Sequence, residues 1–425
     1  MRTIETHLAE VTALVEGALR SRPVDALVVT PEALVSRSAR YRDRELAVDV
    51  VAPIDLPPFA NSQMDGYAVS TPGLDPAGPT TLRVAERIPA GRAAPDLVVG
   101  TAAPIMTGAA VPAGADAIVP IEKVAPDVFP PVGVDSVVEV PAGVVAGAFV
   151  RAAGSDVAAG TVLFSAGTRL TPARWGVLAA SGIDAVEVRS RPRLLLVSTG
   201  EELAAPGAPL GPGQIHDANG VTLAAALAEV GVEVTVARVT DDATALLTVV
   251  ARHAAETDLV LTSGGVSAGA YEVVRDAFEG SGVTFGSVAM QPGGPQGWGT
   301  VRVHDRELPV VCFPGNPVSS LVSFEAFLRP ALHDVTGVGQ PRRRWTVPLA
   351  HPVDSPVGKH QLRRGRVDVD GRAHLVGGSS SHLLAAHAEA TVLVSIPVGV
   401  DRVDEGDRVE VWALDDPAPH EKADR

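Results

Sequence analysis

Hydrophobic residues recur at three- and four-residue intervals near the start of the chain. Between residues 4 and 20 they fall on one face of a helix, at Leu8, Val11, Leu14, Val15 and Leu19. The spacing predicts an amphipathic helix that packs against another part of the protein. A second helix is predicted from Arg174 to Ala180, because Thr171 and Pro172 suit its start and Gly182 suits its end.

From Arg191 to about Gly337, short apolar runs alternate with amphipathic ones. The apolar runs include RPRLLLVSTG, VEVTVARV and DLVLTSGG, and the segments between them are GVTLAAALAEVG and DATALLTVVARHAAE. Continuous apolar strands separated by helices predict a parallel sheet covered on both faces. We therefore expect a three-layer α/β domain over residues 188–337.

The rest of the chain divides into β-rich and mixed segments, so the predicted fold class is a multidomain α/β and β protein. Valine-rich runs broken by Pro and Gly predict a β-rich lobe at 51–139. Short alternating runs predict a small C-terminal β-barrel at 338–415. Residues 1–50 and 140–187 are expected to form one mixed, discontinuous N-terminal domain. The polar segment 416–425 is predicted to be disordered.

Composition narrows the classes of function. The 425-residue chain carries a formal net charge of −15, which disfavours nucleic acid and anionic membranes as partners because the protein repels polyanions. The sequence has no secretory signal and no run of about eighteen apolar residues, so no membrane insertion is expected. The lone cysteine, Cys312, fits a reducing compartment. A soluble, cytoplasmic protein is predicted.

The strand ends of the predicted α/β domain carry unusual loops, and ligands of open α/β sheets bind at that edge. The strand LLLVSTG runs into Glu201 and Glu202. Their carboxylates suit either a Mg²⁺ ion or a hydrogen-bonded ligand, and solvated loop acids would have the same pattern. The strand DLVLTSGG ends at Gly264 and Gly265. These glycines let backbone N–H groups approach a phosphate, although a plain turn also fits.

A third strand, PVVCF, ends at a sharp turn before a helix. Asn316 is a good N-cap and Pro317 fits the first helical position. By itself this pattern indicates only a helix start. Two helix N-termini that face one crevice make an anion site more credible than either loop alone.

Polar loops outside the α/β domain identify no function by themselves. Residues 61–68 contain the Asp65-Gly66 turn signal, and Thr107 lies in a second loop. Arg151 lies five residues before Asp156.

Taken in order, these segments resemble the molybdopterin molybdenumtransferase family, the MoeA and gephyrin E-domain group, from about residue 4 to residue 412. The resemblance is carried by NSQMDGYAV, IMTGAAVPAGADAIVPIE, STGEEL, GQIHDAN, TSGGVSAG and FPGNPVSS. It implies a homodimer of four-domain subunits that inserts molybdate into adenylylated molybdopterin and releases AMP, with a divalent cation, Mg²⁺. An enzyme that forms the molybdopterin adenylate is implied as the upstream partner.

The resemblance also implies site residues. The catalytic positions it implies are Asp65, Thr107, Arg151, Asp156, Glu202 and Asp241. Molybdopterin would be bound by Ser198, Thr199, Gly200, Ser263, Gly264, Gly265, Ser267, Pro292, Pro314, Gly315 and Asn316. The metal would be held by Glu201, Glu202, Asp241 and Glu272.

Two departures from the family pattern leave a second hypothesis open. The family has an acidic residue where this chain has Ala270, and an aspartate where it has Glu272. The family's K-P-G-K motif reads Gln291-Pro292-Gly293-Gly294, so two cations are missing from a site for anionic ligands. The substitution resembles a divergent, gephyrin-like subgroup. The alternative is therefore a dimeric adaptor, with little or no catalysis, that binds a peptide tail of a division or receptor protein such as FtsZ.

Overall fold

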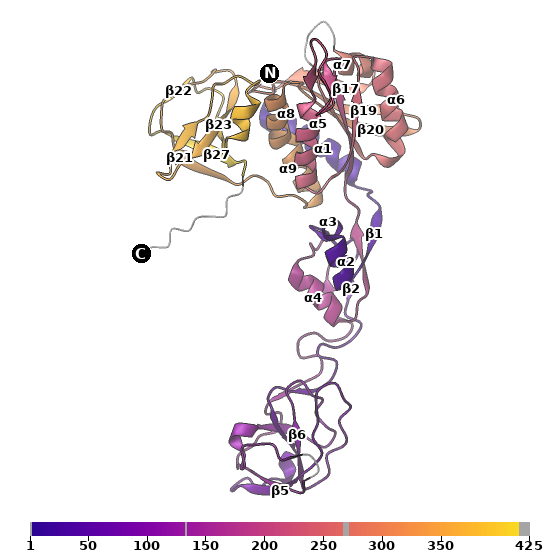
Figure 1. Cartoon of the computed structure of the whole chain (residues 1–425), viewed down its shortest axis with the longest axis vertical. Coiled ribbons are helices and arrows are strands. Elements are labelled where there is room, and N and C mark those ends of the chain that lie inside the picture. The colour runs from indigo at the N-terminus through magenta and orange to yellow at the C-terminus, as the bar shows by residue number, and fades with distance from the viewer. Residues whose placement is uncertain (1, 132–133, 267–271, 416–425) are drawn as a thin grey trace. The chain divides into compact units, whose positions relative to one another are not determined.

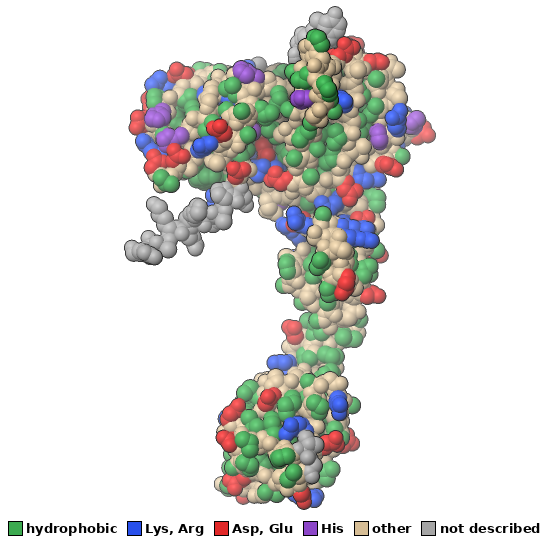
Figure 2. Space-filling view, viewed as in Figure 1, with side chains coloured by type: hydrophobic (Ala, Val, Ile, Leu, Met, Phe, Trp, Pro, Cys, Tyr) green, Lys and Arg blue, Asp and Glu red, His purple; other side chains and the backbone are tan. Residues whose placement is uncertain are grey.

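The computed structural model describes residues 2–131, 134–266 and 272–415, so the tail predicted to be disordered lies outside the described residues. The chain forms two compact units (Figure 1). Unit 1 comprises Met1–Val24, Arg42–Arg44 and Arg189–Arg425, and unit 2 comprises Asp25–Tyr41 and Glu45–Val188. Acidic and basic side chains are interspersed over the visible surface of both units (Figure 2).

The centre of unit 1 is a six-stranded sheet with the order β15-β12-β16-β20-β19-β17. Its strands are β12 (Arg193–Thr199), β15 (Glu233–Val239), β16 (Leu259–Ser263), β17 (Gly282–Ser287), β19 (Pro295–Val303) and β20 (Arg306–Phe313). The first four strands in the sheet order are parallel. From β12 the chain first adds β15 on one side and then adds β16 on the other side. The strand order therefore reverses between β12 and β16.

The predicted parallel sheet is confirmed for four strands but has an antiparallel edge. Strands β17 and β19 run antiparallel to their neighbours. Only His304 and Asp305 join β19 to β20, and His304 takes a positive φ of 51°. Two residues close a hairpin but are far too few for a parallel crossover, which needs a dozen or more.

Helices cover both faces of this sheet, as predicted for three layers (Figure 1). On one face, Leu194 and Leu196 share a core with α1 (Ile4–Leu19), α5 (Ala218–Glu229), α8 (Pro317–Ser323) and the following π-helix (Phe324–Leu328) and α9 (Arg329–Thr336). On the other, Leu195 and Val197 pack with α6 (Ala243–His253) and α7 (Val273–Phe278). The alternation along β12 follows from the two-residue repeat of a strand. Cys312 is fully buried in the second core.

The N-terminal helix lies in a different unit from the one predicted. Val11, Val15 and Leu19 of α1 are buried in the core that α9 and the π-helix share. Residues 1–24 therefore belong with the α/β sheet. The prediction that residues 1–50 and 140–187 form one mixed domain is wrong for this part of the chain. Periodicity identifies the apolar stripe of a helix but not the surface that covers it.

The C-terminal β domain is built on a second six-stranded sheet. The order is β18-β23-β25-β27-β21, with β24 beside β23, and within the described residues the path does not close from β21 back to β18. The strands are β18 (Met290–Gln291), β21 (Arg344–Pro348), β23 (His360–Val367), β24 (Ala373–Leu375), β25 (Val392–Ile396) and β27 (Arg408–Ala413). The pair of β22 (Val353–Asp354) and β26 (Arg402–Val403) packs on this sheet through Val353 and Val403. The same domain contains helix α10 (Leu384–Ala388).

The C-terminal β domain and the α/β domain share parts of their structure. Strand β18 comes from the chain between β17 and β19, yet it pairs with β23. Leu362, Leu393 and Trp412 of the C-terminal sheet are buried in the same core as helices α1 and α5. The two domains of unit 1 are therefore packed as one body.

A buried charge network lies beside this shared core. The Glu325 carboxylate accepts two hydrogen bonds from Arg329 and two from Arg342, at 2.8 to 3.2 Å. Both arginines also pair with Glu229 at 3.2 Å. Because bidentate contacts satisfy the buried carboxylate, the network joins the end of α5, the π-helix and the segment that enters the C-terminal domain.

Unit 2 contains a β-rich lobe and a mixed part. The lobe is a five-stranded sheet with the order β7-β4-β6-β5-β8. Its strands are β4 (Gly66–Val69), β5 (Thr80–Val84), β6 (Thr101–Ile105), β7 (Ala117–Pro120) and β8 (Val137–Val140), with the short pair β3 (Asn61–Ser62) and β9 (Val150–Arg151).

The mixed part of unit 2 has its own apolar core, which includes Leu27, Tyr41, Trp175 and Leu178. Its elements are β1 (Val24–Val28), α2 (Pro31–Ser36), α3 (Ser38–Tyr41), β2 (Val50–Val51), β10 (Val162–Phe164), α4 (Pro172–Ala180) and β11 (Ala185–Arg189). Thr171 caps α4, as predicted. No helix in the described part of the chain has both the length and the apolar character needed to cross a bilayer.

Candidate active site

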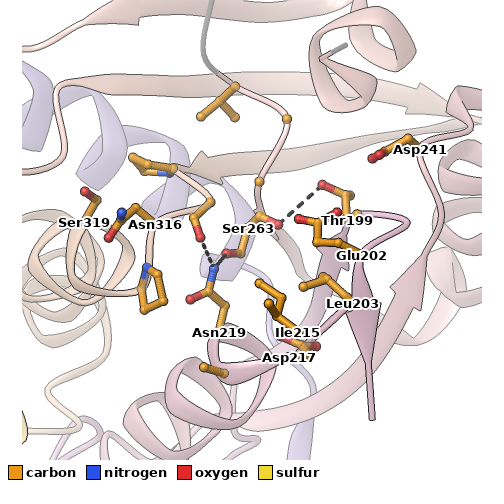
Figure 3. Close-up of a pocket in the computed structure, with 18 of the residues that line it drawn as sticks. Thr199, Glu202, Leu203, Ile215, Asp217, Asn219, Asp241, Ser263, Asn316 and Ser319 are labelled. Atoms are coloured by element: carbon orange, nitrogen blue, oxygen red, sulfur yellow. Dashed lines mark hydrogen bonds between the residues drawn. The ribbon is translucent and has the colours of Figure 1, made fainter. Parts of the chain in front are cut away.

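A cavity of about 500 Å³ opens at the carboxyl ends of β12, β16 and β20. This edge includes the point between β12 and β16 where the strand order reverses, which is where open α/β sheets bind ligands. Figure 3 shows side chains from several loops pointing into the cavity. The predicted site residues that line it are Thr199, Gly200, Glu202, Asp241, Ser263, Gly264, Gly265, Glu272, Pro314, Gly315 and Asn316.

The two glycine loops predicted to converge do so. A Cβ atom added to Gly315 would lie 3.3 Å from the Cα of Gly264, so the loops after β16 and β20 are in contact. Gly264 and Gly265 take φ values of 107° and 61°, which favour glycine. The N–H of Gly264 donates to the Phe313 carbonyl at 3.1 Å and is therefore already used.

The helix starts at the cavity differ from the two that were predicted. Asn316 takes the N-cap position of α8, yet its side chain makes no capping hydrogen bond. Helix α7 is only six residues long and begins at Val273, well after the glycine pair. The longer helix whose first turn reaches the cavity is α5, capped by Asp217, whose Oδ1 accepts a hydrogen bond from Gly220 N at 2.8 Å.

The carboxylates of Glu202 and Asp241 line the cavity on the side away from Asn316 (Figure 3). Glu202 lies so close to Gly200 that an added Cβ there would be 2.6 Å from Oε2 of Glu202. Asp241 accepts a hydrogen bond from the backbone N–H of Glu201 at 3.3 Å. Glu201 itself does not line the cavity. Within the described residues, no group of three or more His, Cys, Asp or Glu side chains is arranged to hold a metal ion. The predicted four-residue metal set is therefore not preassembled.

No arginine or lysine is among the described residues that line the cavity. The predicted loss of two cations is thus not offset within the described lining. The Gln291 side chain accepts a hydrogen bond from Gln361 at 3.0 Å, so it takes part in the contact between β18 and β23.

Two predicted ligand-binding residues do not line the cavity, and a third is not described. Pro292 does not line the cavity, although Pro295, three residues later, does. Ser198 is fully buried behind the cavity wall and does not line it. Ser267, like Ala270, lies outside the described residues.

Sequence reasoning missed the role of Asn219. Its side chain donates to Ser263 Oγ at 2.6 Å and to the Gly315 carbonyl at 2.7 Å (Figure 3). The available signal was the GQIHDAN segment, in which Asp217 suits an N-cap. Neither the cap nor the spacing indicates that Asn219 reaches two loops so distant in sequence.

In unit 2, the predicted residues of the polar loops make hydrogen bonds within that unit. Asp65 Oδ1 accepts hydrogen bonds from the backbone N–H and the hydroxyl of Thr107, at 2.6 and 2.7 Å. These two bonds, the backbone one first, lower the pKa of the exposed Asp65 carboxyl. Arg151 donates to Asn61 Oδ1 at 3.3 Å across the β3–β9 pair. Asp156 donates its backbone N–H to the Leu56 carbonyl at 2.9 Å.

These features define a multidomain protein whose α/β domain holds a polar ligand cavity at the reversal of its strand order. Family models match most of the chain: the MoeA N-terminal region at 3–182, a probable molybdopterin binding domain at 195–334 and the MoeA C-terminal region at 346–414. The chain belongs to the MoeA family of molybdopterin molybdenumtransferases.

Individual relatives support this assignment over the whole length. Molybdopterin molybdenumtransferase 2 of Mycobacterium tuberculosis is 44% identical, over 97% of this chain and 100% of the relative. Molybdopterin molybdenumtransferase of Synechococcus elongatus is 35% identical, over 88% and 92%. The crystal structure of the molybdopterin biosynthesis MoeA protein of Pyrococcus horikoshii matches with a TM-score of 0.76 at 29% identity, covering 95% of this chain and 99% of that one.

Proposed function

We propose that the protein acts in molybdenum cofactor biosynthesis as a molybdopterin molybdenumtransferase, inserting molybdate into adenylylated molybdopterin with release of AMP. Relatives that carry this name over nearly the full length support the reaction. The observation that carries the proposal is the cavity at the strand-order reversal, where two glycine loops touch and the first turn of α5 begins. Such an edge suits a ligand with phosphate groups.

The glycine loops and the start of α5 would bind the phosphates of the substrate. Their backbone dipoles supply positive potential in an otherwise acidic cavity. Thr199 and Ser263 lie at the ends of β12 and β16 and would orient the ligand between these strands. A fixed array of amides costs no reorganisation when charge moves during the reaction.

A Mg²⁺ ion fits this site only together with the substrate. Glu202 and Asp241 both line the cavity, and Mg²⁺ is commonly bound by one or two carboxylates plus substrate phosphates. We propose that these two residues hold the ion, which would neutralise phosphate charge. The absence of arginine and lysine from the described lining makes this contribution more important than it would be in a basic site.

The proposal extends to the residues of unit 2 and to assembly. Asp65, oriented by Thr107, supplies an ionised carboxylate, and Arg151 and Asp156 are proposed to complete the catalytic set. We also propose a cytoplasmic homodimer that receives its substrate from a molybdopterin-adenylating enzyme. The adaptor hypothesis gains no support from the relatives, whose names are those of the transferase.

The reaction is tested by incubating purified protein with adenylylated molybdopterin, molybdate and Mg²⁺ and measuring AMP by chromatography. Turnover should require all three and should fall at least a hundredfold in the Asp241→Asn variant, since a cavity carboxylate is lost. The exposed Asp305→Asn change in the β19–β20 hairpin is the control. The proposed function is refuted if the wild-type protein releases no AMP while a relative does so under the same conditions.

A further inference from the structure

The Asn219 side chain holds three elements of the α/β domain together. It projects from the first turn of α5, and its amide nitrogen donates to Ser263 Oγ at 2.6 Å and to the Gly315 carbonyl at 2.7 Å. Ser263 ends β16, and Gly315 lies in the loop between β20 and α8. One carboxamide therefore uses both of its N–H groups on loops that are more than 50 residues apart in the chain.

The two bonds fall where the glycine loops touch. Gly264 follows Ser263 directly, and its Cα lies 3.3 Å from the position of a Cβ on Gly315. Ser263 Oγ is also 3.3 Å from Ser320 Oγ, and Ser320 in turn donates to the Pro314 carbonyl. The Ser263 hydroxyl and the carbonyls of Pro314 and Gly315 are thus all hydrogen-bonded, and Asn219 is the contact that reaches both loops from a third element.

Helix α5 is itself held firmly, so Asn219 has a rigid base. Asp217 is buried and caps the helix. Leu223 and Leu227 are fully buried in the core beneath the sheet. A side chain on such a base transmits its position to the groups that it binds.

We propose that Asn219 is a positioning residue that sets the separation of the two glycine loops and thereby the spacing of the groups that bind the substrate phosphates. The second half of this statement rests on the proposed function; the first half concerns the protein alone. Asn219 acts through Ser263 and Gly315, and no direct chemistry on the substrate is assigned to it.

Hydrogen exchange of the ligand-free protein tests the first half. The Asn219→Asp side chain has the same shape but no N–H to donate, and its oxygen would face the Gly315 carbonyl. We expect amide exchange to rise by roughly tenfold or more in peptides 258–266 and 311–317, as the loss of two hydrogen bonds implies. Thr222→Ala is the matched control, because it removes the hydroxyl bond to the Ala218 carbonyl in the same helix without touching either loop.

Kinetics of AMP release test the second half. Loosened loops should raise the KM for adenylylated molybdopterin by roughly tenfold with kcat changed less than about threefold, whereas a general loss of folded protein would lower kcat alone. Unchanged exchange in both loops, or an equal rise throughout the α/β domain, would overturn the proposal. So would a KM equal to that of the wild type. If the wild-type protein releases no AMP, the proposed function fails, and the exchange experiment still decides whether Asn219 fixes the loops.

Discussion

The Gly264→Ala substitution tests the close fit of the glycine loops most directly. The new methyl group would lie 2.7 Å from the Thr199 hydroxyl oxygen and 2.9 Å from the Thr199 carbonyl oxygen. Both distances are shorter than real Cβ atoms tolerate, and the carbonyl belongs to the backbone at the end of β12. Relief therefore requires the β16 loop or the end of β12 to move.

The magnitude follows from two contributions. A φ of 107° costs an alanine about 2 kcal/mol, because only glycine populates this region readily. The overlap with Thr199 adds on the order of 1 kcal/mol or more, as for an overpacked core. We therefore expect the free energy of unfolding of unit 1 to fall by about 3 kcal/mol. If the loop is displaced while the protein stays folded, and the same amount of about 3 kcal/mol is lost from transition-state binding, kcat/KM should fall by roughly a hundredfold.

Gly280→Ala is the matched control for this substitution. Gly280 also has a positive φ, 75°, but no atom lies within 4 Å of an added Cβ. This change should cost about 1 kcal/mol and leave AMP release unaltered. Urea unfolding followed by circular dichroism, together with AMP release, separates the two variants. Equal losses of stability and activity in both would refute the inference that contact between the Gly264 loop and Thr199 shapes the site.

Three further predictions concern other parts of the molecule. Thr107→Ala removes one of the two donors that lower the pKa of Asp65, so that pKa should rise and the acidic limb of the activity profile should move to higher pH. Because folding lowers the pKa of Asp65, its ionised carboxylate stabilises the fold at pH values above the pKa of the unfolded state. This contribution is lost as the pH falls through the pKa of the folded state. Arg329→Met leaves the buried Glu325 with one arginine fewer and should lower the free energy of unfolding by about 3 kcal/mol, measured in urea. Gly294→Lys adds a cation next to the cavity residue Pro295 and should lower the KM for adenylylated molybdopterin by about tenfold.

Each of these predictions has a control in the chain. Thr71 donates to Asp116 through the same two groups, so Thr71→Ala should leave the pH profile of activity unchanged. Arg302→Met breaks only an exposed ion pair and should change stability by less than about 1 kcal/mol. Gly294→Ala has ordinary contacts and no added charge, so it should leave the KM unchanged. Each prediction is contradicted if the control variant changes the measured pH profile, stability or KM as much as the variant it is paired with.

Local patterns predicted the elements and loops that depend on neighbours in sequence. The helix over residues 4–20, the start of α4 at Pro172 and the glycine turn after β16 follow from apolar periodicity, capping and the need for positive φ. The meeting of two glycine loops at one edge followed from the rule for parallel strands. These features need only the sequence of one segment and a general rule of topology.

Features that depend on tertiary contacts were missed or wrong. The antiparallel edge came from the two-residue turn at His304 and Asp305, whose flanking strands have no distinctive alternation. The placement of α1 depends on α9, which is about 310 residues further along the chain. Asn219 binds two loops that only the folded sheet brings together. A single sequence carries no signal for such pairs.

The two-residue strand β18 limits how the protein can be dissected. Because Met290 and Gln291 complete the edge of the C-terminal sheet, excision of that domain after residue 337 would remove the partner of β23. Excision would expose Leu362, Leu393 and Trp412 on the isolated C-terminal domain. The α/β domain left behind would lose the same three side chains from its core. Unit 1 should therefore melt in a single transition, and truncated versions should aggregate before they reveal anything about domain-specific activity.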